Sequence, residues 1–313
     1  MTLGETNPAN ERRRRARDPS TSGSAASRSL GTRLADACFA LRPYVWCYGQ
    51  HQGQVPGESL SVPLPARPKH VLSFVFGDRY RMRRSEGGDV ETSPRAVIFG
   101  PQTRQRLRLV IGRRVDTFTI HFQPSGFHQL FGTPMGAFAD AEHDARSVLG
   151  RSIPALEEQL AVAPSFEARC RVADAFLMAR VAAARAPDPV AAAANHMFAA
   201  NGALRVAALA AWCGLSARQF ERRFFEQIGV TPKLYARIAR FNAALDKGLR
   251  TPAATLTDLA HDLGFYDHMH MVHDFRTFAG DTPARFLARL HSVPEFHSVF
   301  ATEDRLRGRR AAA

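Results

Sequence analysis

A group of polar side chains suited to contact with a nucleic acid occupies one short stretch of the 313-residue sequence: Arg218, Glu221, Arg222 and Arg223. A guanidinium carries a planar fork of donors that fits phosphate oxygens or the acceptor edge of a guanine. The same stretch places Phe220, Phe224 and Ile228 at positions i, i+4 and i+8. An α-helix with that spacing buries the apolar residues along one side and turns the residues between them outward. We therefore expect a helix with an apolar inner face and a basic outer face.

This helix belongs to a unit that occurs twice near the C-terminus, at 206–232 and again at 256–283. Each copy keeps a glycine, Gly214 or Gly264, after a short apolar segment, and glycine suits the left-handed end of a helix. The residues placed to cap the helices that follow are Ser216 and Asp267. The second copy repeats the buried positions with Met271, Phe275 and Phe278. This agreement indicates a duplicated helix-turn-helix, whose second helix enters the major groove of DNA.

The segment that joins the copies, PKLYARIARFNAALDKGL, has the pattern of a helix. Pro232 suits a first helical turn, and an apolar stripe runs through Leu234, Ile238, Phe241 and Leu245. About 17 helical residues span roughly 25 Å at ~1.5 Å per residue. Such a helix could hold two recognition helices about one DNA turn (~34 Å) apart on one face of a duplex.

Residues 188–290 resemble the DNA-binding domain of the AraC/XylS family of bacterial transcription regulators. The matching motifs are LAAWCGLSARQFERRFFEQIGVTPKLYARIARF and LAHDLGFYDHMHMVHDFRTFAGDTPARF. The resemblance implies base contacts by Arg218, Glu221 and Arg222 in the first unit, and by His268, Met269, His270 and His273 in the second. His268 and His273 stand where relatives commonly carry Gln and Arg, and an imidazole lacks the bidentate fork of a guanidinium. We expect the first unit to discriminate bases more strongly than the second.

The sequence from about residue 34 to 121 consists of short apolar runs separated by proline and glycine. Expected strands are 44–48, 59–64, 71–76, 96–99, 106–111 and 117–122, which together favour a β-sandwich or barrel. Helical patterns follow at 124–135, 153–164 and 166–185. In the last of these the expected apolar face is Val172, Phe176, Leu177, Met178 and Val181. The fold class is therefore α+β, with a β-rich N-terminal domain that ends in helices and an all-α C-terminal domain.

Residues 39–183 also resemble an uncharacterised N-terminal domain found in a subset of the AraC/XylS family. The matching pieces are LRPYVWCYGQ, VIFGPQTR and TIHFQPSGFHQLFGTPM. In the family such domains sense a small molecule or mediate dimerisation, and both alternatives stay open here. Tyr44, Trp46 and Tyr48 alternate along one expected strand, where aromatic residues can fill a β core or line a ligand pocket. Filling of the core is the simpler interpretation.

Several chemical classes are disfavoured by the residues themselves. No Ser/His/Asp grouping, paired carboxylates or phosphate-binding glycine loop supports catalysis, so we expect no enzyme activity and no cofactor. Cys38, Cys47, Cys170 and Cys213 have no metal spacing, and the four histidines of the second unit lack one as well. We expect the cysteines to be buried in a reduced compartment, with a redox role as the alternative. No run of eighteen apolar residues predicts a membrane span.

The net charge of +13 is compatible with an anionic partner. The expected boundaries are a disordered basic arm at 1–33, a regulatory domain at 34–187, a DNA-binding domain at 188–290 and a tail at 291–313. We interpret the chain as a cytoplasmic, sequence-specific transcription factor, with Arg223, Arg237 and Arg240 contacting DNA phosphates. The implied partners are double-stranded DNA, RNA polymerase, a small-molecule effector and a second copy of the chain. The alternatives are a constitutive regulator whose N-terminal domain only dimerises, and an enzyme with an accessory DNA-binding domain.

Overall fold

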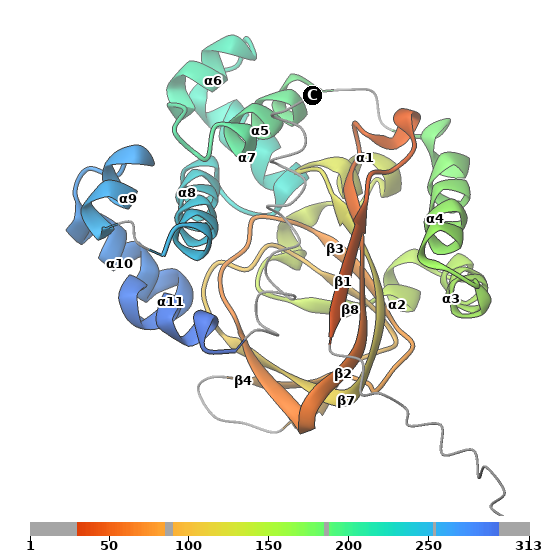
Figure 1. Cartoon of the computed structure of the whole chain (residues 1–313). Coiled ribbons are helices and arrows are strands. Elements are labelled where there is room, and N and C mark those ends of the chain that lie inside the picture. Colours follow the sequence, from red (N-terminus) through yellow and green to blue (C-terminus); the bar gives the residue numbers. More distant parts are fainter. Residues whose placement is uncertain (1–29, 85–89, 185–187, 253–254, 294–313) are drawn as a thin grey trace, which may run out of the picture.

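The protein is described here by a computed structural model that covers residues 30–84, 90–184, 188–252 and 255–293. A curved antiparallel sheet forms the N-terminal half, and the helices of the C-terminal half lie beside it (Figure 1). Most of the basic arm, the tip between residues 84 and 90, and most of the tail lie outside the described residues. The arm was predicted to extend to residue 33, but Gly31–Ala35 form strand β1 and pair with the edge of β2. The sheet therefore begins earlier than the sequence indicated.

Among the described residues, eight strands form the sheet, in the order β1-β2-β7-β3-β6-β8, with β4 and β5 as a side hairpin next to β7. The strands after β1 are β2 (Val45–Leu64), β3 (Val71–Val75), β4 (Arg81–Arg84), β5 (Val90–Thr92), β6 (Ala96–Phe99), β7 (Leu107–Phe122) and β8 (Glu142–Asp144). The expected strands at 44–48 and 59–64 are one long strand, as are those at 106–111 and 117–122. Pairing between β2 and β7 is interrupted between Gln54 and Ser59. An irregularity of that kind bends a strand, which is why the sequence pattern broke there.

The helical end of this domain packs on one face of the sheet. It comprises α1 (Gly126–Phe131), the 3-10 turn η2 (Met135–Phe138), α2 (Ala145–Leu149), α3 (Ser152–Val162) and α4 (Phe166–Val181). Phe118 and Ile120 of β7 face these helices and share a core with Leu177 of α4. The predicted apolar face of α4 is partly wrong, because Met178 is 39% exposed. Arg169 of α4, which was not predicted to be buried, is buried because it forms an ion pair with Asp116 of the sheet.

Seven helices make up the C-terminal half of the described chain: α5 (Pro189–Ala199), α6 (Val206–Trp212), α7 (Ala217–Ile228), α8 (Pro232–Arg250), α9 (Leu256–Asp262), α10 (His268–Ala279) and α11 (Pro283–His291). The predicted pairs are α6–α7 and α9–α10, and the predicted joining helix is α8. Ile238, Phe241 and Leu245 of its expected stripe are buried, while Leu234 is partly exposed. The α+β fold class is confirmed.

The two halves share hydrophobic cores. Val62 and Leu64 at the end of β2 belong to one core with Ile238, Phe241 of α8 and Phe278 of α10. Figure 1 shows α8 to α11 on the side of the sheet away from α3 and α4. The boundary expected near residue 188 therefore separates two parts of the chain that are in extensive contact.

Candidate nucleic-acid interface

The first helix-turn-helix is built as its sequence pattern indicates. Gly214 adopts a left-handed conformation with φ +66° between α6 and α7, where an L side chain would be strained. Ser216 caps α7 by accepting from the Gln219 backbone N–H at 3.3 Å, and the Gln219 side chain accepts from the Ser216 backbone N–H at 3.1 Å. Phe220 and Phe224 are fully buried. The turn and the cap thus fix where α7 starts and which face it buries.

The predicted base-reading residues of the first unit are all exposed. Arg218, Glu221 and Arg222 occupy the first turns of α7, on the side away from Phe220 and Phe224. At 100° per residue the three fall within one sector of the helix surface, a third of its circumference or less. Residues near the N-terminus of a recognition helix are those that reach base edges in helix-turn-helix complexes. The geometry is compatible with the predicted contacts.

The second unit presents a different set of side chains at the same place. Asp267 caps α10 by accepting from the backbone N–H of His270 at 2.7 Å. His268, Met269 and His273 are exposed, with Met269 at 56%. His270 is only partly exposed, because its ring lies edge-on against buried Phe265 at 5.8 Å. Three of the four predicted residues of this unit are therefore exposed to solvent.

The three arginines predicted to contact phosphates each have a partner within the protein. Arg223 forms an ion pair with Asp188 at 2.8 Å, and Arg240 donates to the Gly202 carbonyl at 3.0 Å. Arg237 forms an ion pair with Asp274 at 2.6 Å. Burial lowers the pKa of Arg240. Their role toward DNA stays a prediction. Within the protein, Arg223 joins α7 to the start of α5, Arg237 joins α8 to α10, and Arg240 joins α8 to the loop after α5.

Sequence reasoning missed the contact between α7 and the N-terminal domain. Phe225 lies one turn beyond Glu221 and Arg222 on α7, and its ring would meet a Cβ at Gly136 of η2 at 2.7 Å. At the end of α7, a Cβ on Gly229 would lie 2.5 Å from the Met135 carbonyl oxygen. Phe225 does not belong to the apolar stripe of Phe220, Phe224 and Ile228. This position of a large apolar side chain was the signal in the sequence for a second apolar contact of α7. The N-terminal half of α7 is open while its C-terminal end is covered by η2.

Residues of the sheet and of its connecting loops line a partly open cavity of about 100 Å³. Its apolar lining includes Leu64, Phe99 and Leu109, and its polar lining includes Arg67, Lys69, His51, His121 and Gln102. Thr119 and His121 of β7 face this cavity, whereas Phe118 and Ile120 face the opposite side, as a period of two requires. This is the second candidate site, and it was not recognised from the sequence.

The aromatic strand expected at 44–48 divides between two places. Tyr48 is fully buried in the core of the sheet, as the simpler interpretation held. Trp46 instead packs edge-to-face on Phe198 of α5, with ring centroids 5.4 Å apart. The β2–β7 register shifts between Val45 and Cys47, so the alternation of faces breaks at Trp46.

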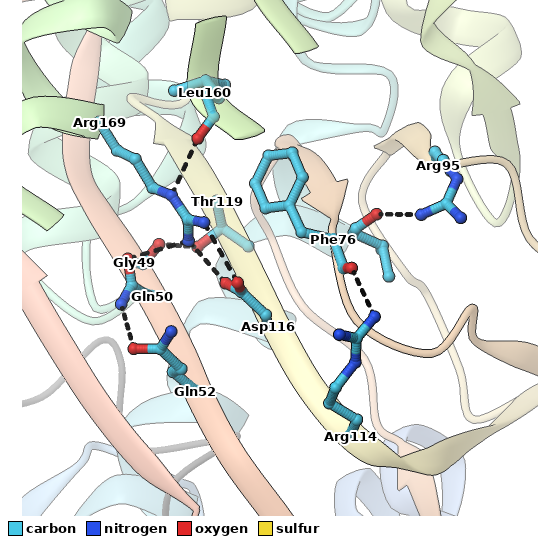
Figure 2. A network of polar contacts seen from close by, with 11 residues as sticks. Gly49, Gln50, Gln52, Phe76, Arg95, Arg114, Asp116, Thr119, Leu160 and Arg169 are labelled. Carbon is cyan, nitrogen blue, oxygen red and sulfur yellow. Dashed lines mark hydrogen bonds and ion pairs between the residues drawn. The ribbon is translucent and has the colours of Figure 1, made fainter. Parts of the chain in front are cut away.

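A network of polar contacts centred on Arg169 holds helices α3 and α4 against the sheet (Figure 2). Arg169 of α4 makes a bidentate ion pair with Asp116 of β7, at 2.6 and 3.2 Å, and also donates to Gln50 of β2 at 3.2 Å. Its Nε donates to the Leu160 carbonyl at 3.1 Å, so a single side chain ties α3, α4 and two strands together. Because Nε, Nη1 and Nη2 of Arg169 all donate to groups of the protein, we interpret this residue as a structural link between α4 and the sheet.

Other chemistry finds little support in the described part of the chain. No group of three histidine, cysteine or acidic side chains there is placed to hold a metal ion. The four cysteines are buried or partly buried thiols, and burial raises the pKa of Cys170 to about 12. A raised pKa disfavours the reactive thiolate. No helix within the described ranges is long and apolar enough to cross a membrane.

Comparisons with known proteins agree with this layout. Residues 209–289 match the family described as "Helix-turn-helix domain", and residues 35–144 match the "Domain of unknown function (DUF6597)". A search of curated proteins finds no match. The solved structure of ToxT from Vibrio cholerae is 11% identical with a TM-score of 0.43, covering 83% of this chain and 98% of ToxT.

Two further solved structures are similar to the chain. ToxT from Vibrio cholerae O395 bound to (E)-4-(8-methylnaphthalen-1-yl)but-3-enoic acid is 11% identical, with a TM-score of 0.43 and coverage of 84% of this chain and 100% of that one. The AraC-like transcriptional activator CuxR is 16% identical, with a TM-score of 0.25 and coverage of 66% and 84%.

The helix-turn-helix match spans both units, and the β-rich domain precedes it. Together these features define a DNA-binding transcription regulator. The two domain matches agree with the resemblance to the AraC/XylS family that the sequence shows.

Proposed function

We propose that this regulator recognises a specific DNA sequence by placing α7 and α10 in adjacent segments of the major groove. The observation that carries the proposal is the exposure of Arg218, Glu221 and Arg222 on α7 together with His268 and His273 on α10. The 19 residues of α8 join the two units. At ~1.5 Å per residue they span roughly 28 Å, close to one turn of DNA.

A binding titration with Arg222→Ala tests the first unit. On a duplex selected from random sequence by the full chain, we expect a loss of about 1–3 kcal/mol and a relaxed preference at one base pair. Arg171→Ala, which removes an exposed arginine of α4, is the charge-matched control and should leave specific binding unchanged. An equal loss on selected and random duplexes would make Arg222 a phosphate contact instead.

A second titration tests α10 through His273. An imidazole next to polyanionic DNA gains charge as the pH falls, so we propose that affinity rises between about pH 8 and pH 6. His273→Arg keeps its charge throughout and should bind more tightly with a flatter pH dependence. If wild type, His273→Arg and His273→Ala share one pH dependence, His273 does not lie at the DNA.

The remaining proposals concern domains and partners. We assign DNA binding to residues 188–290 and regulation to the β-rich domain, whose cavity is the site for a small-molecule effector. RNA polymerase, a second copy of the chain and a cytoplasmic location fit a regulator of this kind. If no small molecule changes the affinity for DNA, the alternative of a constitutive regulator is favoured. The mass of the protein–DNA complex shows whether one or two copies of the chain bind.

A further inference from the structure

Helices α7 and α10 can be compared position by position, because both have 12 residues and both begin and end in the same way. Ser216 caps α7, Asp267 caps α10, and a glycine in the left-handed conformation ends each helix. A residue of α7 therefore corresponds to the α10 residue 51 positions later in the chain. The buried residues agree with this correspondence, since Phe224 falls on Phe275 and both are buried.

The outward positions of the two helices carry different chemistry. Arg218 and Glu221 of α7 correspond to Met269 and Val272 of α10. Met269 is 56% exposed, and Val272 is partly exposed. Residues three apart on a helix are neighbours on its surface. Where the first unit presents a hydrogen-bond donor and an acceptor, the second unit therefore presents an apolar pair.

Val272 is not among the base contacts that the family resemblance implies, whereas His270 is. His270 corresponds to Gln219, which closes the capping box of α7. At 100° per residue, Met269, Val272 and His273 share one sector of α10, about a third of its circumference. The correspondence with α7 therefore replaces His270 by Val272 on the face of α10 that lies toward the bases.

The major-groove edges of the base pairs carry hydrogen-bond donors, acceptors and one apolar group, the C5-methyl of thymine. An apolar side chain against a donor or acceptor displaces water without replacing its hydrogen bonds, which costs free energy. The same side chain against a methyl group buries apolar surface on both partners, which is favourable. Single apolar residues are common on protein surfaces, so the exposure of Met269 alone has no such meaning. Its position on a recognition helix gives it one.

We propose that the second helix-turn-helix unit recognises thymine through its C5-methyl group, and that Met269 and Val272 determine this preference. The proposal rests on the proposed function, in which α10 lies in the major groove. Burial of one methyl group changes the affinity about fourfold. A bidentate contact between arginine and guanine discriminates by roughly 5- to 150-fold. The DNA site therefore has two unequal parts, one contacted through hydrogen bonds from α7 and a thymine-containing one contacted by α10.

Replacement of single thymines by deoxyuridine tests the contact with the full-length chain. Deoxyuridine pairs with adenine as thymine does and lacks only the C5-methyl group. On a duplex selected from random sequence by the full chain, we expect at least one thymine whose replacement weakens binding about fourfold. A selected site without a preferred thymine, or unchanged affinity after replacement of every thymine, overturns the proposal.

Two alanine variants test whether α10 makes the methyl contact. Met269→Ala and Val272→Ala should each bind the thymine and deoxyuridine duplexes equally at the position that the removed side chain contacts. Met178→Ala of α4 and Val162→Ala of α3 remove exposed side chains of the same types and should retain the difference between the duplexes. A difference that persists at every position in one α10 variant excludes that residue. Persistence in both overturns the proposal.

Met269→Arg gives a readout that does not depend on a loss of binding. It places on α10 the side chain that α7 carries at the same position as Arg218, and a guanidinium fits the O6 and N7 edge of guanine. Selection from random sequence should then change thymine to guanine at one position, and an unchanged thymine there overturns the role of Met269.

The selection with the wild-type chain separates this inference from the proposed function. If the chain selects no DNA sequence, the proposed function and this inference fail together. If it selects a sequence in which no thymine methyl group affects the affinity, this inference fails alone.

Discussion

The ion pair between Arg237 and Asp274 offers the sharpest test of how the two helix-turn-helix units are held together. Asp274 of α10 has no exposed side-chain area, and Arg237 of α8 donates to its Oδ1 from Nη2 at 2.6 Å and from Nε at 3.3 Å. Arg237→Met keeps most of the side-chain length but leaves the buried carboxylate without its counter-charge. Breaking a buried pair in this way costs about 3–5 kcal/mol. Because the Arg237 side chain is 32% exposed, we expect the lower end, about 3 kcal/mol.

Chemical denaturation of the full chain measures this cost, and a second substitution isolates its cause. Asp274→Asn turns the buried charge into a neutral amide, so the double variant should be more stable than Arg237→Met alone. A loss below about 1 kcal/mol, or no recovery in the double variant, would refute the reasoning. DNA titration separates this role from the phosphate contact expected from the sequence. A phosphate contact predicts uniform weakening on all duplexes and a salt slope smaller by about 1.

Three further predictions follow from burial and backbone geometry. Burial lowers the pKa of His70 to about 4. The His70 ring therefore stays neutral in the folded chain at a pH where, in the unfolded chain, it takes up a proton near pH 6.5. The free energy of unfolding should therefore fall by up to about 3 kcal/mol as the pH drops from 6.5 to 4, and His70→Gln should flatten that limb of a denaturation series. Gly229→Ala should cost more stability than Gly214→Ala, because both have positive φ but only Gly229 lies against the Met135 carbonyl oxygen, and equal denaturation midpoints would contradict the contact. A fragment of residues 188–290 should select the same DNA sequence as the full chain but denature at a lower midpoint, since its core loses the contacts from β2 and β7.

Much of the C-terminal half could be predicted because its signals are local. The i, i+4 spacing of Phe220 and Phe224, the Ser216 cap and the glycine at 214 act within one or two turns of chain. Those interactions depend on neighbours in sequence, so a periodic pattern reports them directly. The exposure of Arg218 and Arg222 followed from the same pattern.

The β-rich domain was predicted only in outline. Strand positions such as 71–76 and 96–99 came from apolar runs, but β2 and β7 continue through polar and glycine-containing segments that look like turns. Pairing with a distant strand supplies the hydrogen bonds that keep those segments extended. Trp46 lies on the opposite face of the sheet from the one that strict alternation predicts, because the β2–β7 register shifts next to it. A register shift leaves no mark in an alternating sequence pattern.

The sequence by itself therefore determined the duplicated unit, the helix that joins the copies and the outward residues of α7, because helices are specified by contacts three and four residues apart. Only the tertiary structure decided the partners of Arg237 and Arg240 and the cover of η2 over the end of α7. These depend on segments more than thirty residues apart in the chain meeting in space. An arginine that binds a phosphate and one that pairs with a buried aspartate look the same in the sequence. The groups that the fold places around the guanidinium decide which partner it has.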